Sequence, residues 1–228
     1  MQFHRHERIV VLIDGLHLRS TERALGFHID YNRLRARFQS GAHLLRIVYY
    51  SPLAAQVEED PLRRLLDWLS YNGYQVVTRP ARQFVDDEGK SHIRGNIRVA
   101  LAVDAMDLAA TTDHIVLIAG HGDFAYLVEA LKRRGKRVTV LSSTRSVVAD
   151  ELRRQSDVFV EFETLMPDLE LPAETTGLAK NELPDDAETA PRHRANAEPP
   201  HNPVAVERRR LPPRPARDSS RGIKDLDE

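Results

Sequence analysis

The sequence predicts an α/β fold in which helices cover both faces of one mainly parallel sheet of about six strands. Two observations carry this prediction. Short runs rich in β-branched residues alternate along the chain with longer stretches whose apolar residues recur at helical spacing. Such alternation is typical of strand–helix–strand units, which place their strands parallel in one doubly wound sheet.

The expected strands are short apolar runs bounded by polar or turn residues. The first is RIVVLID at 8–14, which ends on Asp14. Later runs such as HIVLIA and RVTVLS share its length and its β-branched content, as strands of one sheet do. The remaining strands are expected at 44–50, 74–79, 114–119, 137–142 and 158–162.

The expected helices lie between these runs, and several have recognisable ends. Pro61 falls in the first turn of the third helix, where its missing N–H costs little. Gly73 and Gly135 stand where helices should stop, and glycine is the usual C-cap. The stretch DDEGKSH at 86–92 predicts a hairpin-like excursion or a mobile loop. Helices are expected at 16–25, 31–39, 58–72, 97–110, 123–134 and 146–154.

The composition changes after about Leu169. The segment 169–228 is rich in Pro, Ala, Glu and Arg and has no sustained apolar periodicity. Such a segment cannot bury enough apolar surface to offset an ordering entropy of roughly 1–2 kcal/mol per residue. We therefore expect a folded domain over 1–168 and a disordered tail over 169–228. Within the tail, ERRRLPPRPAR at 207–217 could attract RNA or a protein partner that reads polyproline II helices.

Bulk composition limits the possible chemistry. Lys and Arg total 33 and Asp and Glu 34, so the whole chain has no strong preference for a polyanion and any basic surface must be local. The chain has no cysteine, which excludes disulfides, thiolate metal sites and cysteine nucleophiles. The first apolar run, broken by Asp14, is too short for a signal peptide or a membrane span. We expect a cytoplasmic protein without membrane association.

Polar residues follow two of the expected strands at their carboxyl ends. Asp14 ends the first strand and is followed by His17, while His121 and Asp123 follow the fourth in IAGHGDF. In a doubly wound sheet these two strands are expected to be neighbours where the strand order reverses, which is where ligands collect. The plainer interpretation makes Asp14 a turn residue and Asp123 the N-cap of the next helix. One side chain can serve both roles.

The helix expected at 97–110 brings a further acid. Asp104 lies close to its expected apolar stripe, where a carboxylate without a partner would be costly to bury. It therefore either meets a cation such as Arg94 or Arg98, or faces the crevice. The residues expected to face the sheet at helical spacing are Val99, Val103, Met106 and Ala110.

Three stretches resemble one family. VVLIDGLHL is similar to I-D-G-x-N-L, RGNIRVALAVDAM to K-G-x-D-V-x-L-A-x-D, and IVLIAGHGDFAYLVEALKRRGKRVTVL to V-S-G-D-S-D-F-x-P-L-V-x-x-L-x-x-x-G-K-x-V. These are motifs of NYN domain proteins of the LabA-like group, a branch of the PIN-like ribonuclease superfamily, and the resemblance covers residues 8–165. It implies a Rossmann-like, PIN-like three-layer sandwich whose acidic residues bind Mg²⁺ or Mn²⁺ and cleave RNA.

The resemblance also implies roles for individual residues. Asp14, Asp104 and Asp123 would be the catalytic acids, with Asp14 and Asp123 as metal ligands. His17 and His121 stand where the family has Asn and Asp, and we expect them to join Asp14 and Asp123 as metal ligands, because imidazole suits Mn²⁺ or Zn²⁺ better than Mg²⁺. The Asp of the family's second motif is replaced by Arg98, which together with Arg94 could contact RNA phosphates.

Three functions are compatible with this pattern. The first is a metal-dependent ribonuclease with an altered acidic site. The second is an RNA-binding or regulatory module that has kept the fold after losing carboxylates, and the third is a protein-interaction scaffold that uses its Pro/Arg-rich tail. The basic cluster of Lys132, Arg133, Arg134 and Lys136 ends a helix, so we interpret it as complementing the helix dipole.

Overall fold

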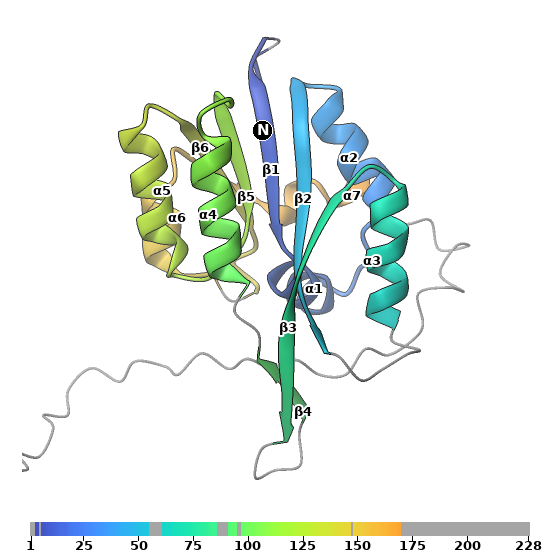
Figure 1. Ribbon diagram of the computed structural model, residues 1–228. Helices are drawn as coiled ribbons and strands as arrows, with labels where there is room; N and C mark the ends of the chain where they lie inside the picture. Colours follow the sequence, from blue (N-terminus) through green and yellow to red (C-terminus); the bar gives the residue numbers. More distant parts are fainter. Residues whose placement is uncertain are drawn as a thin grey trace, which may run out of the picture. The chain divides into compact units, whose positions relative to one another are not determined.

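The computed structural model describes residues 3–4, 6–54, 61–85, 91–94, 97–146 and 148–169, without the side chains of 54, 81–85 and 91–94. They form one seven-stranded sheet in the order β4-β3-β2-β1-β5-β6-β7 (Figure 1). Six strands are parallel, and β4 pairs antiparallel with β3. The strands are β1 (Arg8–Asp14), β2 (His43–Ala54), β3 (Gln75–Val85), β4 (Ser91–Arg94), β5 (His114–Ile118), β6 (Arg137–Ser142) and β7 (Val158–Glu161).

Helices cover both faces of the sheet, so the predicted three-layer α/β fold is confirmed (Figure 1). Alternate side chains of β1 enter opposite cores: Val11 packs with α1, α2 and α3, whereas Leu12 packs with α4 and α5. The helices are α1 (Gly15–Leu25), α2 (Tyr31–Gln39), α3 (Pro61–Tyr71), α4 (Arg98–Leu108), α5 (Phe124–Arg133), α6 (Asp150–Gln155) and α7 (Met166–Leu169), with a 3₁₀ turn η1 (Phe162–Thr164) before α7.

The elements agree closely with those predicted, with differences at their ends. The antiparallel pair β3–β4 matches a hairpin-like excursion, although residues 86–90 lie outside the described residues. The sequence did not predict η1 and α7. Leu169, expected to begin the tail, is buried, and its carbonyl accepts the N–H of Asp30 at 2.8 Å. Residues 170–228 lie outside the described residues, and so does the expected tail.

The face of α4 that packs on the sheet was predicted wrongly. Val99 and Val103 are 59% and 53% exposed, whereas Leu101 and Ala105 are fully buried. The helix is apolar on nearly all sides, so spacing alone could not choose between two stripes. The stripe that contains Leu101, Ala105 and Ala109 is the one buried in the core.

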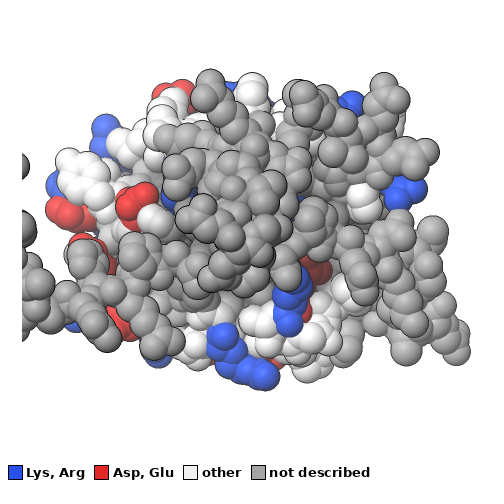
Figure 2. Space-filling model, turned by 90° about the horizontal axis from the view of Figure 1, so that it is seen from below, with Lys and Arg blue, Asp and Glu red and all other residues white. Residues whose placement is uncertain are grey.

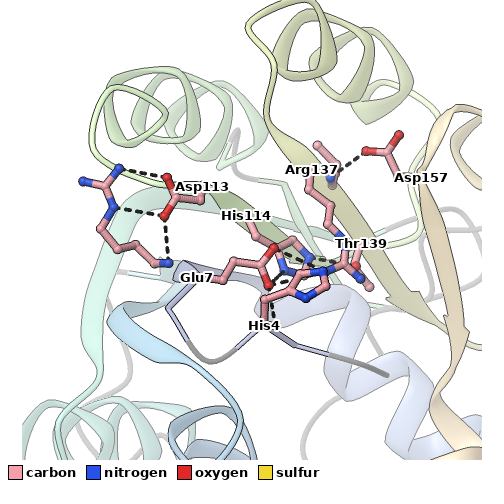
Figure 3. Close-up of polar contacts among 9 residues, drawn as sticks. His4, Glu7, Asp113, His114, Arg137, Thr139 and Asp157 are labelled. Carbon is pink, nitrogen blue, oxygen red and sulfur yellow. Dashed lines mark hydrogen bonds and ion pairs between the residues drawn. The ribbon is translucent and has the colours of Figure 1, made fainter.

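The amino ends of the strands are closed by a buried polar cluster, which we call the amino-end cluster (Figure 3). His114 is fully buried, with Nε2 2.8 Å from the hydroxyl of Thr139 and Nδ1 3.4 Å from the carboxylate of Glu7. The same carboxylate accepts from Arg137 at 3.2 Å and from the N–H of His4 at 3.2 Å. Glu7 therefore ties the N-terminal segment to β5 and β6.

Within the described ranges, no helix is both long enough and apolar enough to cross a bilayer.

Candidate functional site

The candidate site lies at the carboxyl ends of β1 and β5. These strands are hydrogen-bonded neighbours, paired up to Ile13 and Ile118, with β2 on one side and β6 on the other. The strand order reverses here, as the sequence predicted. Helices α1 and α5 follow β1 and β5 directly, so both helices begin at this edge (Figure 1). Ligands of open α/β sheets bind at such switch points.

Asp14 lies at this edge and also begins a helix. It is 4% exposed, and its Oδ1 accepts the N–H groups of Leu16 at 3.1 Å and His17 at 3.3 Å. It is therefore the N-cap of α1. A side chain at Gly15 would overlap the ring of Tyr49 and the carbonyl of Tyr50, which explains the Asp-Gly pair. One oxygen of Asp14 is thus committed to the fold.

His17 turns its ring toward the loop after β6. Its Nε2 lies 2.9 Å from the hydroxyl of Ser142 and 3.4 Å from that of Thr21, and Thr21 donates to Ser146 at 3.1 Å. Burial lowers the pKa of His17 to about 4, so its ring is neutral at neutral pH. This network joins α1 to the segment 142–146. Sequence reasoning missed these hydroxyls, although the run SSTRS directly after an expected strand could have signalled them.

His121 and Asp123 lie together on the other side of the switch point. Nδ1 of His121 accepts the N–H of Asp123 at 3.2 Å and lies 3.2 Å from the carboxylate of the same residue. Their side chains are 37% and 69% exposed. Asp123 occupies the N-cap position of α5 but makes no capping hydrogen bond, so the expected capping role is wrong. The carboxylate is held beside the imidazole instead.

Asp104 is not part of this group. It lies six residues into α4, about 9 Å along the helix axis from Arg98. The hydroxyl of Tyr50 donates to its carboxylate at 2.9 Å, and burial together with this bond raises the pKa of Tyr50. Asp104 also lines a cleft of about 160 Å³ with Arg46 and Gln75 on the α4 side of the sheet. Its partner is thus a tyrosine rather than the arginine that the sequence suggested.

The two arginines expected to bind RNA lie before and at the start of α4. Arg98 is the first residue of that helix and is half-buried, and α4 begins at the carboxyl edge (Figure 1). Arg94 ends β4, but its side chain lies outside the described residues. Figure 2 looks onto this edge, where described basic and acidic side chains form separate spots of both signs. Among the described residues, the charge at any place on this edge therefore depends on single side chains and not on one large patch of either sign.

The residues present do not fit a divalent ion in their observed arrangement. Asp14 caps α1, His17 contacts Ser142, and Asp123 is held beside His121. Within the described part of the chain, no three or more His, Asp or Glu side chains gather as a metal site would require. His121 and Asp123 are close enough for one ion to contact both, but Asp14 and His17 would have to leave their present partners to complete a site.

Known proteins resemble this chain along most of its length. The model of the NYN domain family matches residues 8–165. The low amplitude and bright protein LabA of Synechococcus elongatus is 26% identical over 191 residues, which is 82% of this chain and 96% of LabA. A crystal structure of a protein of unknown function from Vibrio parahaemolyticus superposes with a TM-score of 0.60 at 25% identity, covering 75% of this chain and all of that one.

The family model spans both strand ends of the switch point as well as α4, so it includes all the residues described above. The resemblance seen in the three sequence motifs is thereby confirmed, and the similarity to LabA agrees with it. The chain belongs to the NYN domain family.

Proposed function

We propose that this NYN domain binds single-stranded RNA at the carboxyl edge of its sheet, through phosphate contacts that require no metal ion. The observation that carries the proposal is the presence of an arginine at position 98. It occupies the position at which the family motif has an aspartate, so one site position changes from negative to positive. A change of this sign weakens binding of a cation and favours binding of an anion.

The position of Arg98 on its helix supports the same proposal. A cation in the first turn of a helix opposes the helix dipole and costs about 0.3–1 kcal/mol. The helix dipole therefore does not explain an arginine at this position of α4, whose first turn has no acidic residue and whose N-cap makes no side-chain hydrogen bond. Guanidinium groups and helix N-termini both bind phosphate well. RNA is the polyanion that the family's kinship with PIN-like ribonucleases indicates.

The test is a titration of labelled single-stranded RNA with the full chain in the presence of a chelator. We expect Arg98→Glu to lower the affinity about tenfold and to reduce the dependence on salt by about one phosphate contact. The matched control is Arg154→Glu, which reverses the charge of an exposed arginine in the last turn of α6. This variant should bind RNA as the wild type does. Equal affinity of the Arg98 variant and the wild type would refute the proposal.

A metal-dependent ribonuclease is the second candidate function. It is favoured by Asp14 and Asp123, which keep two of the family's acidic positions at the ends of neighbouring strands. The half-exposed imidazole of His121 beside Asp123 favours Mn²⁺ or Zn²⁺ over Mg²⁺. An RNA cleavage assay across the three ions, with Asp14→Asn as control, tests it. Cleavage that depends on Asp14 would make this the better function, and its absence with every ion would exclude it.

A further inference from the structure

The solvent face of α3 carries a line of aromatic and charged residues. Arg64, Trp68 and Tyr71 follow one another at intervals of four and three residues, so they lie on one side of the helix. Trp68 is 39% exposed and Tyr71 is 90% exposed. The opposite side of α3 is buried in the core through Leu62, Leu66 and Leu69. We call Arg64, Trp68 and Tyr71 the α3 stripe.

The fold does not require aromatic rings on this face. Tryptophan and tyrosine are poorer helix formers than alanine, leucine or lysine, so local helix stability does not explain them. The core of this layer is already filled by the leucines of α3 and by Tyr74. Large apolar groups that stay exposed on a helix commonly mark a binding surface.

The described charged residues of α2 and α3 are mainly positive. Helices α2 and α3 lie on the same face of the sheet and contain five arginines but only one acid, Asp67 (Figure 1). Two of these arginines form ion pairs: Arg33 lies 3.4 Å from Asp30, and Arg37 lies 4.0 Å from Asp168. The other three are Arg35, Arg63 and Arg64.

Arg35 belongs to α2 and lies beside the C-terminal end of α3. Its guanidinium lies so close to Gly73, just past the end of α3, that a side chain at that glycine would overlap it. Arg64 lies one turn before Trp68. Along α3, Trp68 and Tyr71 therefore follow Arg64 and precede Gly73, which the guanidinium of Arg35 contacts.

We propose that the α3 stripe is a second contact surface for single-stranded RNA, on which Trp68 and Tyr71 stack bases while Arg64 and Arg35 contact the flanking phosphates. Residues three apart on a helix are about 4.5 Å apart along its axis, a spacing that adjacent bases of a flexible strand can match. Aromatic rings between basic groups are the usual composition of sequence-tolerant single-strand sites. The inference rests on the proposed function, which it extends from the sheet edge to a helix face.

The chain contains its own probe for this proposal, because Trp68 is its one tryptophan. The experiment titrates the full chain with single-stranded RNA oligonucleotides of increasing length and follows tryptophan emission together with the anisotropy of a label on the RNA. A base stacked on Trp68 quenches its emission. We expect saturable quenching with the same midpoint as the anisotropy change, for oligonucleotides long enough to reach α3.

Substitutions separate the stripe from the sheet edge. We expect Trp68→Leu and Tyr71→Ala each to lower the affinity for long RNA about tenfold, equivalent to about 1.4 kcal/mol, and to leave the affinity for the shortest binding oligonucleotides unchanged. The matched control is Tyr126→Ala, which removes another exposed tyrosine, 71% exposed on α5, and should bind as the wild type does. Circular dichroism verifies that each variant is folded.

The possible outcomes distinguish failure of the α3 stripe from failure of RNA binding at the sheet edge. RNA binding that depends on Arg98, without quenching of Trp68 and with unchanged affinity of both stripe variants, overturns the stripe and leaves the edge proposal standing. Absence of any RNA binding overturns both. A change of tryptophan emission when the protein alone is concentrated would assign the stripe to self-association and overturn RNA as its occupant.

Discussion

The two ends of the same parallel sheet use their polar residues in opposite ways. At the amino ends, Glu7 and His114 are buried and contact each other, Arg137 and Thr139 (Figure 3). At the carboxyl ends, the carboxylate of Asp123 is 69% exposed and does not cap the helix that it precedes. The first end is fixed by its own contacts, whereas the second presents groups that a ligand can engage.

The difference follows from the direction of the chain. Helices α1 and α5 leave the strands at the carboxyl edge and turn their positive ends there, while residues before the first strand return to the amino edge. The amino edge can therefore be closed by salt bridges and hydrogen bonds within the chain. The contacts that close the amino end are made within the chain, so changes of side chains at the open end leave them in place.

The largest expected effect comes from breaking the closed end. Glu7→Ala removes the carboxylate that contacts both His114 and Arg137, and it leaves the guanidinium without this partner. Removing one member of a buried ion pair commonly costs 3–5 kcal/mol, and because Arg137 keeps some solvent contact we expect about 3 kcal/mol. Urea unfolding followed by circular dichroism measures this loss.

The matched substitution at the open end is Asp123→Ala. Its side chain is mostly exposed, and its partner among the described residues is the half-exposed His121, so the free energy of unfolding should change by less than about 0.5 kcal/mol. Similar losses for the Glu7 and Asp123 variants would show that the two ends do not differ as we describe.

A second, smaller effect concerns pH, because the open end holds the partly buried His17 and the closed end holds the fully buried His114. Burial lowers the pKa of His17 to about 4, and it also lowers that of His114 although Glu7 acts against this shift. In both cases the folded pKa lies below the unfolded value of 6.5, so the unfolded chain binds more protons between the two values. Their contribution to stability is complete above pH 6.5 and is lost as the pH falls below it.

The partly buried Glu22 has a pKa shift of the opposite sign. Burial raises the pKa of Glu22 to about 7 from 4.5, so its contribution to stability is present below pH 4.5 and is lost as the pH rises through 7. Unfolding by urea should therefore be measured from pH 4.5 to 7.5 in three variants. We expect His17→Asn and His114→Asn to remove part of the loss on acidification, and Glu22→Gln to remove part of the loss near neutrality. Unchanged profiles in all three would contradict these assignments.

Sequence patterns predicted most of the strands and helices because these elements follow local rules of apolar spacing and turn residues. The position of β1 next to β5 agreed with the expected doubly wound topology, so the strand ends before Leu16 and His121 lie at the same edge of the sheet. The buried face of α4 did not, because Val99 and Leu101 belong to stripes of similar apolar character and only packing decides between them.

Side-chain partners were harder to predict than positions. The pairing of His17 with Ser142 joins residues far apart in the chain, and so does that of Glu7 with His114. No periodicity or spacing reports such contacts. Asp104 shows the same limit, since its partner Tyr50 lies on another strand and its distance from the edge depends on how α4 docks.

Small expected effects at Asp14, which lies at the open end and also supports the fold, sharpen the comparison. Its Oδ1 caps α1 with two N–H groups, so Asp14→Ala should cost about 1 kcal/mol in urea unfolding. Asparagine caps helices about as well as aspartate, and Asp14→Asn should therefore change stability by only a few tenths of a kcal/mol. The two carboxylates of this edge have different partners, Asp123 being held by His121. A substantial gain in stability for Asp14→Asn would mean that the acids of this edge repel each other in the folded protein, as they would around a metal site. An equal loss for Ala and Asn would instead mean that the charge of Asp14, and not its capping oxygen, stabilises the start of α1.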